Sequence, residues 1–101
     1  MAIAEVSIIP VGTGSPSVSR YVARAVTVLQ QEKDVKYELT PMGTVIEGDL
    51  NRILALVEAM HQTAFDEGAL RVVTRVEIDD RRDKSITGQS KLDSVMKKLE
   101  K

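Results

Sequence analysis

The sequence predicts an α+β fold in which a four-stranded antiparallel sheet carries two helices on one face, with an extra helix at the C-terminus. Two observations support this prediction. Short segments rich in β-branched residues alternate with longer segments in which apolar residues recur at helical spacing. The chain of 101 residues also suits a single domain with one hydrophobic core.

The first strand is expected over Ile3–Ile9, where every second residue is apolar on one face. Pro10 is expected to end it, because proline cannot donate to a strand ladder. A loop over residues 11–15 follows. The first helix is predicted to begin with Ser15 as N-cap and Pro16 at its first position, and to end near residues 31–33. Its expected apolar stripe consists of Val18, Val22, Ala25, Val26 and Leu29.

A β-hairpin is predicted next, from the strands Val35–Thr40 and Thr44–Glu47. Pro41 fixes its own φ near −65°, which excludes the primed two-residue turns. A type I turn closed by Gly43 in the left-handed region, as a bulge, is expected instead.

The second helix is predicted to run from Asp49 as N-cap to Gly68 just beyond its end. Its expected buried stripe consists of Ile53, Leu54, Val57, Met60, Ala64 and Phe65. The fourth strand is expected over Leu70–Asp79. Five of its side chains should face the helices, namely Leu70, Val72, Thr74, Val76 and Ile78.

The order βαββαβ, with right-handed crossovers, predicts a ferredoxin-like sheet with both helices on one face. The whole chain, 1–101, is expected to be one domain with its core at about 2–79. A polar linker at about 80–89 should lead to a helix at about 90–100, for which Ser90 and Asp93 resemble a capping box. The apolar stripe of this helix is Leu92, Val95, Met96 and Leu99.

The sheet face without helices is expected to mix apolar and charged side chains, such as Ile3, Ile9, Val73, Arg71 and Glu77. Such a surface is typical of a subunit interface or a ligand cavity. A short terminal helix also needs a docking surface. The sequence therefore favours a homo-oligomer, although a solvated face with scattered apolar residues is the simpler alternative.

Composition argues against several classes of function. The net charge is −1 and only Tyr21, Tyr37 and Phe65 are aromatic, which does not favour nucleic acid or an anionic membrane as partner. The chain lacks cysteine, and its N-terminus does not resemble a secretory signal, so a cytoplasmic protein is expected. The chain has no apolar run long enough to predict a membrane span.

Catalysis and metal binding are also poorly supported. His61 is the only histidine, and its place beside a buried stripe favours a structural role. The acidic run at Asp79, Asp80 and Asp83 is more typical of a solvated surface than of a cation site. We therefore expect neither an enzyme nor a metal or cofactor site.

Two other polar features leave alternatives open. An anion could bind the backbone at Gly12–Ser17, or near Arg81, Arg82 and Lys84, which would suit a regulatory protein for an anionic metabolite. Strand carboxylates could hold a ligand amine or could pair across strands with Arg71 and Arg75; these carboxylates are Glu5, Glu47 and Glu77.

Two segments closely resemble the small thiamine-binding protein family. They are residues 37–48, YELTPMGTVIEG, and residues 6–13, VSIIPVGT. The resemblance extends over essentially the whole chain. It implies a ferredoxin-like subunit that assembles into dimers and tetramers, and non-catalytic binding of thiamine or its hydroxymethylpyrimidine part by a carrier or sensor.

An aminopyrimidine suits a small site with a carboxylate, hydroxyl groups and an apolar wall. The expected ligand-binding residues are Ser7, Tyr37, Thr40, Met42, Gly43, Thr44 and Glu47. Glu47 is the expected partner of the amine or the thiazolium. The alternative for residues 41–43 is a simple hairpin turn, and for the whole protein a structural interaction module without a small ligand.

Overall fold

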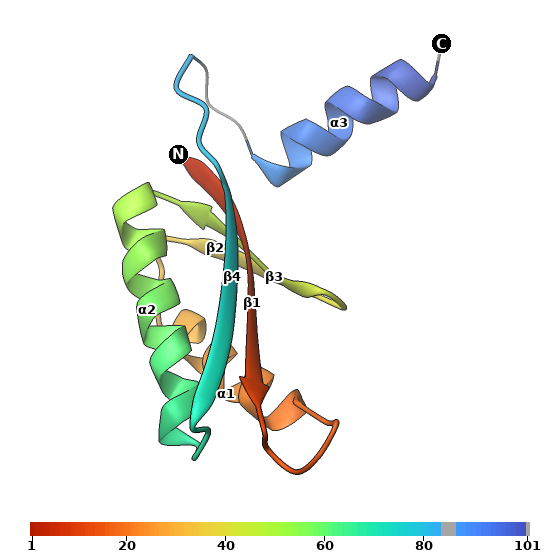
Figure 1. Ribbon diagram of the computed structural model, residues 1–101. Helices are drawn as coiled ribbons and strands as arrows, with labels where there is room; N and C mark the ends of the chain where they lie inside the picture. The colour runs from red at the N-terminus through yellow and green to blue at the C-terminus, as the bar shows by residue number, and fades with distance from the viewer. Residues whose placement is uncertain (84–86, 101) are drawn as a thin grey trace.

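The computed structural model describes residues 1–83 and 87–100. The order of elements is β1 (Ala2–Val11), α1 (Ser19–Gln30), β2 (Lys36–Thr40), β3 (Gly43–Gly48), α2 (Leu50–Asp66), β4 (Arg71–Asp79) and α3 (Gly88–Leu99). The strands form one antiparallel sheet in the order β2-β3-β1-β4. This is the predicted ferredoxin-like arrangement, with α1 and α2 on one face and α3 apart from them (Figure 1).

The core lies between the sheet and the two helices. Small residues on β1 let α2 approach closely, and larger side chains fill the space between them. The most deeply buried large side chains are Val6, Leu29, Ile46, Ile53 and Met60. The predicted inward face of β1 is therefore confirmed by Ala4 and Val6, each at most 2% exposed.

β1 is longer than predicted, because Pro10 lies within the strand and pairs with Val72 of β4. β1 pairs with β3 only as far as Val6. Beyond that residue one side of β1 is an edge, where a missing N–H breaks no ladder bond.

The predicted start of α1 is wrong. The helix begins at Ser19 with Val18 as N-cap. The Ser15 hydroxyl instead accepts a hydrogen bond from the backbone of Ser17, a local turn that competes with helix capping. Tyr21, which the sequence stripe omitted, is buried together with Ala25 and Leu29.

The hairpin forms as predicted, but its turn differs. Thr40 pairs with Gly43 across a two-residue loop, and Gly43 does not have a positive φ. Gly43 is required for another reason: a Cβ there would lie 2.8 Å from the carbonyl oxygen of Val6. The glycine permits a close approach of two backbones and does not supply a left-handed bulge.

In α2 the predicted stripe is correct for four residues and wrong for Leu54 and Phe65, which are exposed. Each follows a buried residue by one position and so points about 100° away from it around the helix. Leu56 and Thr63 are buried in their place. Gly68 has a φ of 104°, as expected for a residue just beyond a helix end.

At the start of β4, Leu70 is 95% exposed, because the strand begins one residue later and Ala69 fills the buried position. Ile78, also predicted to face the helices, is 42% exposed, since it lies near the end of the strand.

The capping box of α3 lies three residues earlier than predicted. Thr87 is the N-cap and exchanges hydrogen bonds with Ser90. Part of the predicted linker, residues 84–86, lies outside the described residues.

Candidate functional site

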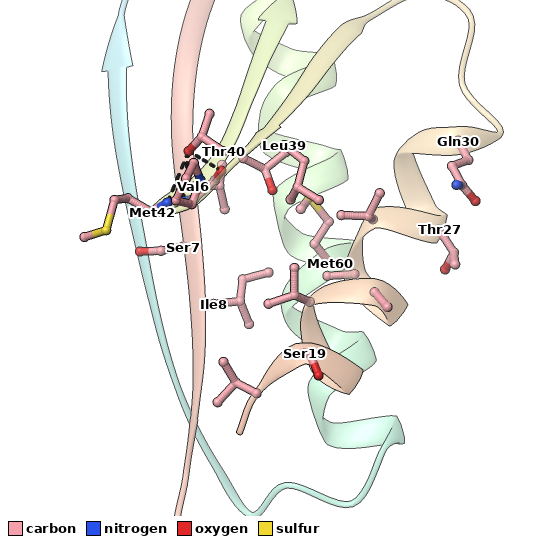
Figure 2. A pocket seen from close by; sticks show the side chains of 18 of the residues that line it. Val6, Ser7, Ile8, Ser19, Thr27, Gln30, Leu39, Thr40, Met42 and Met60 are labelled. Carbon is pink, nitrogen blue, oxygen red and sulfur yellow. Dashed lines mark hydrogen bonds between the residues drawn. The ribbon is translucent and has the colours of Figure 1, made fainter. Parts of the chain in front are cut away.

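A cavity of about 850 Å³ lies between α1, the middle of β1 and the tip of the β2–β3 hairpin (Figure 2). Its position follows from the sheet register. β3 leaves β1 at Val6, whereas β1 continues along β4 to Val11. No strand therefore fills the space beside the second half of β1 on the hairpin side.

The cavity wall is mainly apolar. Ile8 and Met60 lie between β1 and α1 in Figure 2. Val22 and Val26, both on α1, contribute the helix side of the wall. The polar lining consists of serine and threonine side chains and Gln30. None of the described residues that line the cavity is ionisable.

Thr44 is the buried polar residue of this wall. It lies on the helix-facing side of β3, paired with Val6 and Leu39, and is 4% exposed. Its hydroxyl has no hydrogen-bond partner among the described residues. Among the described residues, every side-chain nitrogen or oxygen that is fully enclosed has a hydrogen-bond partner. Because the Thr44 hydroxyl has none, it is not fully enclosed and faces the cavity. It is free to bond a ligand.

Thr40 also lines the cavity, but its hydroxyl is already committed. It donates to the carbonyl oxygen of Gly43 at 2.8 Å and accepts from the backbone of Gly43 at 3.1 Å and of Met42 at 3.3 Å. These bonds, dashed in Figure 2, hold the hairpin turn over the cavity.

The hairpin tip and β1 bring further predicted residues to the same place. Met42 at the turn is 82% exposed, and Gly43 lies against the backbone of Val6. In Figure 2, Ser7 and Met42 extend to the side of β1 opposite Ile8 and Met60. Both therefore lie at the rim of the cavity and not in its interior.

Two predicted residues do not line the cavity. Glu47 lies on the sheet face without α1 and α2, beside Ile3, and its carboxylate accepts a hydrogen bond from the backbone of Gly88 at the start of α3. Tyr37 pairs with Ile46 and is partly exposed outside the cavity. Five of the seven predicted residues are thus brought together.

The helical periodicity of α1 predicts Val22 and Val26 as core residues, whereas they line the cavity. Ordinary helical periodicity covers both roles. The sequence carries no signal that separates them, because the cavity depends on where β1 and β3 cease to pair.

At the two alternative anion sites, described groups that could bind an anion are bonded to other parts of the protein. Arg82 and Asp80 form an ion pair at 2.9 Å, which lowers the pKa of that carboxyl, and Arg81 pairs with Asp83. In the Gly12–Ser17 loop, the Thr13 hydroxyl donates to the carbonyl oxygen of Ser15 at 3.0 Å. Lys84 lies outside the described residues.

His61 has a structural environment. Its Nδ1 lies 2.6 Å from the hydroxyl of Thr74 on β4, and its ring meets Phe65 edge-on at 5.3 Å. Within residues 1–83 and 87–100, His, Asp and Glu side chains form no group of three that could hold a metal ion.

Among the helices of the described part of the chain, none is long and apolar enough to cross a membrane.

A family model described as thiamine-binding protein matches residues 4–96. The UPF0045 protein YqgV of Bacillus subtilis is 52% identical over 103 residues, which cover 99% of each chain. A UPF0045 protein of Methanothermobacter thermautotrophicus is 42% identical over 98% of this chain and 100% of that protein.

Solved structures agree with these matches. A hypothetical protein from Methanocaldococcus jannaschii has a TM-score of 0.85 at 44% identity and covers 94% of this chain and 95% of its own. A Bacillus cereus domain of unknown function has a TM-score of 0.80 at 31% identity and covers 90% of this chain and 86% of its own.

Proposed function

Because the chain belongs to the thiamine-binding protein family, we propose that it binds thiamine, or the hydroxymethylpyrimidine part of thiamine, without catalysing a reaction. The ligand site is the cavity between α1 and the hairpin. Its volume of about 850 Å³ falls within the range typical of small-molecule sites.

The unpartnered hydroxyl of Thr44 is the observation that carries this assignment. This hydroxyl faces the cavity without a partner on the described protein, so a ligand that displaces water from the cavity can bond it. A heteroaromatic ring with an amino group offers both donors and acceptors to a hydroxyl, while Ile8, Val26 and Met60 supply apolar contact.

In this proposal Gly43 and Thr40 set the shape of the turn over the cavity, and Ser7 and Met42 contact the ligand at the rim. Glu47 has a different role in this proposal, because its carboxylate is bonded to the start of α3. The amine of the ligand is then recognised by uncharged groups.

Calorimetric titration with thiamine and with hydroxymethylpyrimidine tests the site. We expect saturable binding of at least one of them, weakened about fivefold to tenfold in Thr44→Val, since a net hydrogen bond contributes about 1 kcal/mol. Valine keeps the shape of threonine. Glu47→Gln is the matched control, on the same strand but outside the cavity, and should bind as the wild type does.

Absence of heat with both compounds, together with binding of inorganic phosphate, would support the regulatory alternative with an anionic ligand. Equal losses of affinity in Thr44→Val and Glu47→Gln would contradict the location of the site.

We also propose that the protein acts as a homo-oligomer in which α3 packs against a second copy. α3 has no buried residue, and its stripe of Leu92, Val95, Met96 and Leu99 is exposed in a single chain. A helix of twelve residues is marginal alone in water. The sheet face without α1 and α2 offers apolar surface at Ile9 and Val73.

A further inference from the structure

We propose that the cavity takes the free alcohol of its pyrimidine ligand and discriminates against the phosphate ester of that alcohol. This inference rests on the proposed function and names the class of ligand that the site takes. Its basis is the absence of ionisable side chains among the described residues that line the cavity.

The physical reason is desolvation. A phosphate group that enters a partly enclosed apolar site loses water, and this loss is compensated only if a cation or several donors replace the water. Here Ile8, Val22, Val26 and Met60 form much of the wall, and the polar lining consists only of uncharged hydroxyl and amide groups. These groups can bond a neutral ligand, but no cation among the described lining residues balances a dianion.

The cationic side chains on α1 are occupied elsewhere. Arg20 and Arg24 lie 3.6 Å and 3.3 Å from the carboxylate of Glu67, at the end of α2. Arg75 pairs with Ser7 across β1 and β4 but does not line the cavity. Each would have to leave its place to meet a phosphate there.

The N-terminus of α1 reaches the cavity at Ser17–Ser19 and is the feature that most favours an anion. The N-terminal charge of a helix dipole is only about half an elementary charge. The side chain of Val18, the N-cap, adds no hydrogen-bonding group, and the hydroxyls of Ser17 and Ser19 bond each other at 3.4 Å. This partial charge does not balance a phosphate ester.

The test compares hydroxymethylpyrimidine with its own phosphate ester by calorimetry on the full chain at neutral pH. The two compounds share the ring and differ only in the phosphate. We expect the ester to bind at least about tenfold more weakly, because its charge is not compensated.

Two matched variants test the role of charge. Gln30→Lys places a cation at the cavity and should reduce the ratio of the two ligands' affinities severalfold. Gln62→Lys makes the same change on the exposed surface of α2, away from the cavity, and should leave the ratio of the two affinities unchanged.

Equal affinities of the wild type for both compounds would overturn this inference and leave the proposed function standing. Tighter binding of the ester would also overturn it and would indicate an anion site at the start of α1. If Gln30→Lys has no more effect than Gln62→Lys, charge is not the basis of selection. Failure of both compounds to bind would overturn this inference, and failure of thiamine to bind as well would overturn the proposed function itself.

Discussion

Gly43 shows how one residue sets the shape of the candidate site. It lies where the hairpin passes closest to β1, and its missing side chain lets the two backbones meet. A larger residue would push the hairpin tip away from Val6 and widen the cavity below it. The requirement is steric, and it acts at the edge of the proposed ligand site.

Gly43→Ala should lower the free energy of unfolding by about 1–3 kcal/mol, since a Cβ 2.8 Å from a carbonyl oxygen forces the backbone to move. Urea denaturation measures this change. Gly88→Ala is the control, because a Cβ there meets its nearest atom, on Glu47, at an ordinary 3.5 Å. Equal unfolding midpoints for the two variants would refute the steric role.

Arg52 links the start of α2 to the loop before β2. Its guanidinium lies 2.7 Å from Asp34 and 2.8 Å from Glu32. The hydrogen bond from Arg52 holds the pKa of the Asp34 carboxyl below its usual value. The ion pair therefore stabilises the fold only while Asp34 is charged.

Arg52→Gln should lower stability at neutral pH and have less effect in acid. Because the folded pKa of Asp34 is depressed, its contribution is present above its unfolded pKa of about 3.9 and is lost as the pH falls through the folded value. Urea unfolding of both proteins across the acid range measures this. A difference between them that stays constant with pH would argue against the ion pair.

At the scale of elements, α3 is attached to the rest of the molecule only at its first turns among the described contacts. Glu47 on β3 accepts from the backbone of Gly88, and Lys91 pairs with Asp79 at the end of β4. A carboxylate at a helix N-terminus also interacts favourably with the positive end of the helix dipole. Glu47 therefore orients α3 relative to the sheet.

Glu47→Ala should increase amide hydrogen exchange at Gly88 and through the first turn of α3 severalfold, because the bond that holds this end is lost. Hydrogen exchange followed by mass spectrometry measures it. Glu38→Ala on neighbouring β2 removes a carboxylate from the same sheet face and serves as control. Similar exchange in α3 for both variants would show that Glu47 does not position this helix.

At the scale of the whole molecule, the exposed stripe of α3 and the open sheet face are the surfaces that one chain leaves uncovered. Isolated exposed apolar residues are ordinary, but a helix with a continuous exposed stripe is not stable by propensity alone. Self-association would cover it.

Deletion of residues 90–101 should reduce the mass of the assembly, and the single change Leu92→Arg should reduce it without shortening the chain, because a charge replaces an apolar contact. Light scattering gives the mass. A wild-type mass of 11.1 kDa, or an unchanged larger mass in both variants, would rule out α3 as an interface element.

The order of the elements and the sheet that they form can be predicted from the sequence, since periodicity and turn residues such as Pro41 and Gly68 act locally. The sequence also predicted Thr40, Met42, Gly43 and Thr44 as ligand-binding residues, and these lie together at the cavity because they belong to one hairpin turn. Local signals were less reliable at ends: Ser15 resembled an N-cap, yet its hydroxyl serves a nearby turn.

The position of the cavity and the polar groups that face it depend on how the elements pack together. Glu47 and Thr44 stand three residues apart on β3, so they point to opposite faces of the sheet. Only the packed fold shows that α1 covers the sheet face on which Thr44 lies, and that the start of α3 donates a hydrogen bond to Glu47. The cavity itself exists because β1 and β3 stop pairing at Val6, a consequence of strand register that no single segment encodes.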